Sequence, residues 1–119
     1  MRFLMLHRID ETQPDAFSPT PELMARMGKL VEDSYKAGIL IDTNGLLPSG
    51  AGARVYYKDG RQTVTDGPFA EAKEVIGGYA VIEAESLQRA IDFSREFADC
   101  LGGNADVEIR QISSHDAPN

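Results

Sequence analysis

His7 is the residue whose type best suits proton transfer, because an imidazole titrates near neutral pH. It closes an apolar run that begins at Phe3, whereas the second histidine, His115, lies in the polar C-terminal segment. Asp66, at the start of an Asp-Gly-Pro turn, is the candidate carboxylate that would orient or charge-stabilise the imidazole. Simpler roles stay open: a strand-end histidine bonded to a backbone carbonyl, and an aspartate that caps its own turn.

Residues that could contact a ligand lie in and just after the same turn. They are Gly67, Pro68, Phe69, Lys73 and Tyr79. Tyr79 could donate to developing oxyanion charge, or pack in the core with its hydroxyl satisfied. Lys73 with Glu74 could meet a bound anion or exchange protons, or form an ordinary solvated pair. Phe69 could stack on a ligand or plug the turn, while Gly67 would permit a positive φ and Pro68 would fix φ at roughly −65°.

Metal, cofactor and covalent chemistry lack their usual motifs. His7 and His115 are far apart in the sequence, and no His-x-x-x-His or Cys-x-x-Cys spacing occurs. No glycine-rich phosphate loop and no Gly-x-Ser-x-Gly elbow is present. The single cysteine, Cys100, has no predicted basic partner and fits a small core position in a reducing cytoplasm. We therefore expect no metal, no cofactor and no covalent intermediate.

Composition narrows the class of partner. The chain has 119 residues, of which 42% are hydrophobic, which suits one domain with a modest core over residues 1–112. Its formal net charge of −7 would repel a phosphate backbone, so nucleic-acid binding is not expected. No apolar run is long enough to cross a membrane, and the N-terminal run is too short for a signal peptide. These features predict a cytoplasmic protein.

The elements that must position the candidate residues follow from hydrophobic spacing and turn signals. Expected strands cover residues 2–8, 39–47, 53–58, 61–65, 75–83 and 106–112, expected helices cover 21–37 and 87–101, 48–52 is a flexible connection, and 113–119 is a mobile tail. Alternation along the first strand puts His7 on the same face as Phe3 and Met5. In the strand over 75–83, Ile76 is expected to share a face with Ile82, and Gly77-Gly78 predicts a bulge or a close backbone approach.

The strongest turn signal is Asp59-Gly60, which is typical of a two-residue type I′ hairpin. Its register would pair Tyr57 with Gln62, Tyr56 with Thr63, Val55 with Val64, and Arg54 with Thr65. The second strand of this hairpin leads directly into Asp66. The hairpin is therefore expected to present the Asp-Gly-Pro turn at its base.

The order strand, helix, strand, hairpin, strand, helix, strand predicts an α+β fold. It matches a ferredoxin-like βαββαβ sheet with an inserted hairpin and both helices on one face. The first strand and residues 75–83 are apolar on both sides, so the helix-free face would otherwise be an exposed apolar patch. We expect a homodimer in which two sheets pack face to face as a dimeric α/β barrel.

Several segments together resemble the DGPF branch of the YCII-related family. They are Phe3–His7, Ala37-Gly38, the hairpin, Thr65–Phe69, Glu71–Glu74, Gly77–Tyr79 and Val107–Arg110. The resemblance covers nearly the whole chain and implies a dimeric α+β barrel with a cleft on the sheet face. It also implies, by analogy, a regulatory or accessory role linked to an extracytoplasmic-function sigma factor, a possible partner. Some relatives resemble dehydrochlorinases with a His–Asp pair whose histidine lies in the first helix, and residues 22–37 contain no histidine.

Three functions remain open from the sequence. The first is a small regulatory dimer that binds a small molecule or a protein partner at its cleft. The second is a cofactor-free lyase or isomerase in which His7 is the base, Asp66 orients it and Tyr79 stabilises oxyanion charge. The third is a dimerisation module without a ligand.

Overall fold

The computed structural model describes residues 1–14, 16, 19–69, 72, 74–102 and 105–113. Its elements are β1 (Arg2–Ile9), α1 (Pro21–Lys36), β2 (Leu40–Gly45), the 3-10 helix η1 (Ser49–Ala51), β3 (Ala53–Lys58), β4 (Arg61–Asp66), β5 (Val75–Glu83), α2 (Leu87–Leu101) and β6 (Asp106–Gln111). Most of the expected tail, and with it His115, lies outside the described residues, as does most of the segment 70–73.

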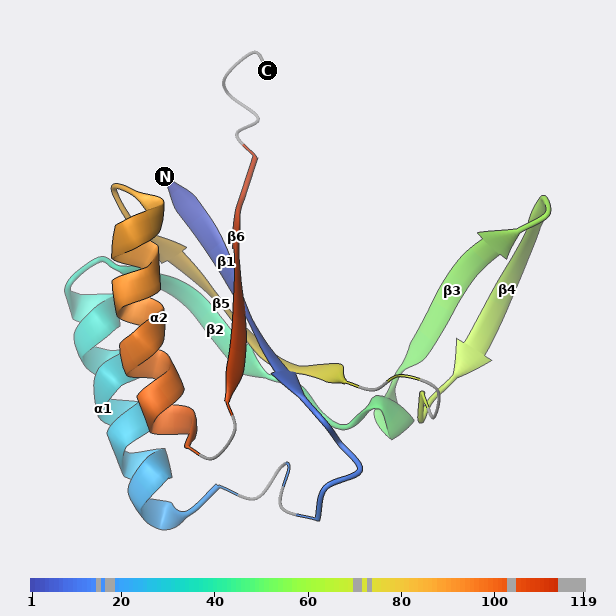
Figure 1. The fold of residues 1–119 in the computed structure, drawn as a ribbon, viewed down its shortest axis with the longest axis horizontal. Helices are drawn as coiled ribbons and strands as arrows, with labels where there is room; N and C mark the ends of the chain where they lie inside the picture. The colour runs from blue at the N-terminus through green and yellow to red at the C-terminus, as the bar shows by residue number, and fades with distance from the viewer. Residues whose placement is uncertain (15, 17–18, 70–71, 73, 103–104, 114–119) are drawn as a thin grey trace.

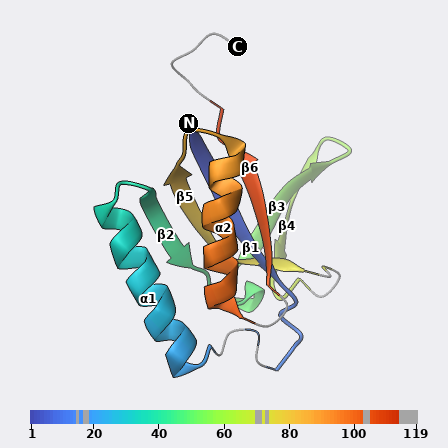
Figure 2. The same ribbon diagram turned by 60° about the vertical axis from the view of Figure 1, so that its left-hand side comes forward.

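The core is a four-stranded antiparallel sheet in the order β2-β5-β1-β6. Both helices cover one face of this sheet, and the β3–β4 hairpin lies on the other side of the molecule (Figures 1 and 2). This order, with the hairpin inserted between β2 and β5, is the predicted ferredoxin-like α+β arrangement. One sheet face is therefore covered within the chain, and the other is left without helices.

Both helices begin and end at the residues that their caps predict. The hydroxyl of Thr20 accepts from the backbone N–H of Leu23, and the hydroxyl of Ser86 accepts from that of Arg89. Pro21 stands at the first helical position of α1, and Gly38 follows the helix with a φ of +75°. These local signals fix the two segments that cover the sheet.

The hydrophobic core lies between the sheet and the helices. Phe3 and Ile82 are 0% exposed, and Ala90 and Phe93 of α2 pack against them. Cys100 is buried, as predicted. Leu87, the first residue of α2, is 52% exposed, because the buried stripe of this helix begins only at Ala90.

The β3–β4 hairpin forms a separate two-stranded sheet with the predicted register, including the pair Val55–Val64. Asp59 and Gly60 have φ values of 53° and 76°, as a type I′ turn requires. Every residue of both strands is exposed. A lone hairpin has no covered apolar face and is marginal in water, so within the chain this element depends on the contacts at its base.

The predicted bulge lies in β5 opposite the end of β1. The register shifts between His7, which pairs with Gly78, and Arg8, which pairs with Ile76, so Gly77 is the extra residue. A Cβ at Gly77 would approach Cδ1 of Ile9 to 2.7 Å, so the Ile9 side chain would have to shift to admit one. The extra residue turns Ile76 to the helix-free face, so the prediction that Ile76 shares the face of Ile82 is wrong.

Candidate functional site

The helix-free face of the sheet is defined by the register of β1 with its neighbours. Leu4, Leu6 and Arg8 point to this face, because the intervening Phe3 and Met5 are buried under the helices. Directly paired residues share a face, and the partners of these three are Val81, Tyr79 and Ile76 in β5 and Arg110, Glu108 and Asp106 in β6. The face is therefore apolar along its centre and charged along β6.

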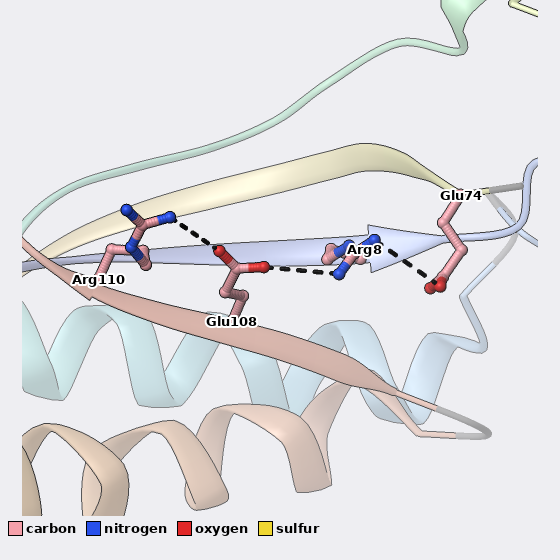
Figure 3. Close-up of polar contacts among 4 residues, drawn as sticks. All are labelled: Arg8, Glu74, Glu108 and Arg110. Carbon is pink, nitrogen blue, oxygen red and sulfur yellow. Dashed lines mark hydrogen bonds and ion pairs between the residues drawn. The ribbon is translucent and has the colours of Figure 1, made fainter. Parts of the chain in front are cut away.

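A chain of ion pairs crosses this face (Figure 3). The guanidinium of Arg8 lies 3.5 Å from Oε1 of Glu108 and 4.0 Å from Oε1 of Glu74. The second oxygen of Glu108 lies 3.3 Å from Nη1 of Arg110. Two arginines thus balance two carboxylates, and the charge of Arg8 is already matched within the chain. Such half-exposed pairs contribute little to stability, so their main effect here is on local charge.

A hollow of about 850 Å³ opens on the same side, between the sheet, η1 and the base of the hairpin. Its lining residues are Leu6, Arg8, Gly45, Leu46, Leu47, Pro48, Ser49, Ala51, Gly52, Arg54, Phe69, Glu74, Val75, Ile76 and Glu108. Most of these side chains are apolar, and the charged ones are Arg8, Arg54, Glu74 and Glu108. Pockets of this size hold small organic ligands through apolar walls and a few fixed polar groups.

Arg54 is the distinctive charged group of the hollow. Its guanidinium carbon lies 4.4 Å from the centroid of the Phe69 ring, a cation–π contact that holds both side chains in place. Among the residues that the structure describes, Arg54 forms no ion pair, in contrast to Arg8. Phe69 is half-buried at the wall of the hollow. The pair thus offers an oriented positive charge beside an aromatic surface.

Ser49 holds the turn that carries Phe69, and no hydrogen bond of the Asp66 side chain is found among the described residues. The backbone N–H of Phe69 donates to Oγ of Ser49 at 2.9 Å. The backbone N–H of Ser49 donates to Oε1 of Glu11 at 2.8 Å, and the Ser49 hydroxyl donates to the other oxygen of that carboxylate. The loop after β1 therefore anchors both η1 and the turn, which fixes Phe69 and Arg54 relative to the sheet.

Gly67 allows the turn to approach η1 closely. A Cβ on Gly67 would lie 1.7 Å from the carbonyl oxygen of Ser49, so no side chain fits. Its N–H donates to the carbonyl of Gly52 at 3.0 Å, and the peptide bond to Pro68 is cis. The expectation of a positive φ at Gly67 is wrong: the described glycines with positive φ are Gly38, Gly60 and Gly102. Likewise, residues 48–52 were expected to be flexible, yet they form η1 with Ser49 buried.

His7 lies on the helix-covered face and lines a different cavity, of about 390 Å³, together with Met27, Val31 and Phe97. Desolvation by burial lowers the pKa of His7 below 6.5, and the negative charge of Asp106 opposes this shift more weakly. The imidazole is therefore mainly neutral at pH 7, the form that a general base or a hydrogen-bonding group needs. This placement separates His7 from the hollow on the opposite face.

Asp66 and Tyr79 occupy other parts of the molecule. Asp66 ends β4, pairs with Ala53 and is exposed, and neither cavity includes both Asp66 and His7. No hydrogen bond or ion pair joins these two within the described part of the chain. The Tyr79 hydroxyl accepts from Nδ2 of Asn44 and donates to Oδ2 of Asp42, both at 2.9 Å. Lys73 lies outside the described residues.

From the sequence, Arg54 was placed only in the register of the hairpin, and neither Arg8 nor Glu108 was a candidate site residue. Alternation along β1 does place Arg8 on the face of Leu4 and Leu6, so a signal for it existed in the sequence. No local pattern could bring Arg54 to Phe69, because that contact depends on how the hairpin base folds back onto η1. Within the described ranges, no three His, Cys, Asp or Glu side chains gather as a metal site would require.

No described helix is both long and apolar enough to span a membrane. In comparisons with known proteins, the family described as the YCII-related domain matches residues 1–113. The chain is also 30% identical over 115 residues to an uncharacterised protein of Rhizobium meliloti (strain 1021), an alignment that covers 95% of this chain and 93% of that relative. The relative has no assigned activity, so the geometry of the site has to carry any functional argument.

Proposed function

This chain belongs to the YCII-related family, and from that premise we propose that it is a homodimeric binding protein whose sheet-face hollow takes a small organic anion with an apolar body. The observation that carries the proposal is Arg54, a guanidinium held over Phe69 at the wall of an 850 Å³ hollow with no carboxylate partner among the described residues. A bound carboxylate would supply that partner.

Local charge supports an anion. Arg8 is matched by Glu74 and Glu108, and Glu108 is matched again by Arg110, which lies outside the lining of the hollow, so these four charges sum to zero. Arg54 is then the charged lining residue that has no ion pair among the described residues. A guanidinium binds a carboxylate through two parallel hydrogen bonds, which gives orientation as well as affinity. The apolar body of the ligand would lie against Phe69, Leu46 and Ile76.

The exposed apolar surface supports the homodimer. Ile76 on the sheet is 46% exposed, and Val55, Tyr57 and Val64 on the hairpin are 59%, 73% and 60% exposed. Burying a side chain of this size is worth roughly 1.5–3 kcal/mol, so a few of them favour association strongly. A second copy packed on the helix-free face would cover them and close the hollow from above. The ligand would then lie in a cleft that one chain cannot complete.

The resemblance to the DGPF branch suggests a setting for this binding. We extend the proposal to a regulatory or accessory role beside an extracytoplasmic-function sigma factor, with ligand occupancy as the signal. The check is co-purification with any such sigma factor encoded next to this protein. If no such sigma factor co-purifies, the proposed regulatory role is refuted, whereas the proposed ligand site is not affected.

The direct test of the ligand site uses 2-naphthoate as probe, with affinity measured by calorimetry. Hydrogen bonds to a charged group contribute about 1.5–3 kcal/mol, so Arg54→Ala should weaken binding roughly tenfold or more. Arg61→Ala is the matched control, because it removes the same charge from the other strand of the hairpin, at a residue outside the lining of the hollow. Equal affinity in the wild type and both variants would refute the anion site.

A cofactor-free lyase or isomerase reaction is the second candidate function, favoured by the neutral imidazole of His7 in a cavity. Its His–Asp pair would require a contact between His7 and Asp66 that the described residues of one chain do not form, since the two residues lie in separate sheets. An NMR titration of His7 in the wild type and in Asp66→Asn tests this pair. A pKa that is the same in both proteins would exclude it.

A further inference from the structure

We infer that the cavity between the sheet and the helices is a second binding site, separate from the hollow, for a neutral apolar molecule that carries one hydroxyl or carbonyl group. His7 is its hydrogen-bonding residue. This inference does not depend on the proposed anion site, because the two sites lie on opposite faces of the sheet.

The cavity follows from one row of residues across the sheet. Gly45, Gly78, His7 and Val107 are successive partners in β2, β5, β1 and β6, and they share the helix-covered face. Two neighbouring positions in this row lack side chains, so the sheet leaves space beside the imidazole. The volume of about 390 Å³ lies within the range of small-molecule sites.

The cavity wall selects an uncharged ligand. Its apolar side chains come from both layers and include Met27, Val31, Phe97, Leu101 and Val107. None of the described residues that line it is charged. A charged ligand would lose its hydration here without gaining a counter-charge, whereas an aromatic or alicyclic body would be buried favourably. Methionine is also flexible enough to adapt to ligands of different shape.

His7 is the polar side chain that remains available. The hydroxyl of Thr43 already donates to the carbonyl of Tyr79 at 2.8 Å, and Nδ2 of Asn44 donates to the Tyr79 hydroxyl. Among the described residues, the imidazole of His7 forms no hydrogen bond, although the His7 backbone pairs in the sheet. A neutral imidazole offers one donor and one acceptor, so it can accept from a hydroxyl or donate to a carbonyl. Burial, which lowers the pKa of His7, keeps it in this form at pH 7.

The experiment compares 2-naphthol with naphthalene as probes at pH 7.5, with affinities from fluorescence and the binding place from NMR shifts. The wild type should bind the naphthol roughly tenfold more tightly, since one buried hydrogen bond separates the two probes. His7→Phe should abolish this preference and keep naphthalene binding. His7→Gln, which restores a donor and an acceptor, should recover part of it.

Gly45→Leu tests the place of binding. A Cβ at Gly45 meets nothing within 4 Å, so a side chain fits without a clash on the helix-covered face that Gly45 shares with His7. Gly45 also borders the hollow, so the NMR shifts of the bound probes decide between the two places. Both probes should bind at least tenfold more weakly to this variant, while Arg54→Ala should leave the ratio of naphthol to naphthalene affinity unchanged. Failure of either probe to bind the folded wild type, or shifts confined to the helix-free face, would overturn the inference. A naphthol preference that survives in His7→Phe would remove the role of His7.

Discussion

At the scale of single residues, the imidazole of His7 and the guanidinium of Arg8 differ in charge and in surroundings, although the two residues are adjacent in the sequence. His7 lies in a cavity without charged walls, where desolvation lowers its pKa. Arg8, the next residue, lies on the other face between two carboxylates. Their chemistry follows from the face to which each points, and the alternation of β1 decides that face.

The lowered pKa of His7 predicts a pH dependence of stability. Between its folded pKa and the unfolded value of about 6.5, the unfolded chain binds a proton that the folded chain does not. The free energy of unfolding should therefore be highest above pH 6.5, where His7 is neutral in both states. It should fall as the pH decreases through this window. Urea unfolding at a series of pH values measures it, and His7→Asn should flatten the curve there. A curve with the same slope in both proteins would contradict the desolvated histidine.

At the scale of elements, the base of the hairpin determines where its functional side chains lie. The strands β3 and β4 pair only with each other, so Arg54 depends on the contacts among Glu11, Ser49, Gly67 and Phe69 for its position. The Asp-Gly-Pro-Phe turn therefore acts as a structural anchor beside the hollow. Asp66 pairs with Ala53 at the end of the hairpin, and Gly67 allows the close contact with η1.

Substitution of Gly67 should loosen this anchor. In Gly67→Ala the new Cβ would overlap the Ser49 carbonyl, and relief of such overpacking typically costs about 1–3 kcal/mol or more. Gly50→Ala is the matched control in the same connection, because a Cβ there meets nothing within 4 Å. Thermal unfolding gives the loss of stability, and amide exchange of β3 and β4 should accelerate in Gly67→Ala alone. Equal behaviour of the two variants would contradict the close approach.

How much of these elements could be predicted depended on whether the signal was local. The register of the hairpin was predicted pair by pair, because Asp59-Gly60 sets it within a few residues. The two helices were predicted within one residue of their observed bounds, and their caps at Thr20 and Ser86 also act within a few residues. The hydrogen bonds from Glu11 through Ser49 to Phe69 join three segments that are distant in the sequence, and no periodicity in the sequence marks them. The same holds for Arg54, so the candidate site was predicted much less well than the fold.

At the scale of the whole molecule, one covered and one uncovered sheet face make an asymmetric domain. The helices hide the face of Phe3 and Ile82, while Leu6 and Ile76 remain on the helix-free face. The proposed dimer would cover this second face and the projecting hairpin together (Figure 1). Its strength then depends on apolar residues near the centre of the sheet.

Leu6→Glu should disrupt the dimer. A buried charge without a partner costs about 3–5 kcal/mol, so dissociation should become easier by at least about a hundredfold. Met24→Glu is the matched control, because Met24 lies on α1 and is 60% exposed. Sedimentation equilibrium should find a dimer for the wild type and the control, and a monomer for Leu6→Glu. A wild type that remains monomeric at micromolar concentration would contradict the dimer.

The alternation of side chains along β1 sets one further property of this domain. His7 and Arg8 are joined by a single peptide unit, yet they line cavities on opposite sides of the sheet. The two proposed ligands would therefore lie on either side of one strand, with the backbone of β1 between them. Thermodynamic linkage requires that any change one ligand causes in the dissociation constant of the other be returned by the same factor. Titrating each probe in the presence of the other would measure that factor, and any coupling it reveals would have the backbone of one strand as its shortest path.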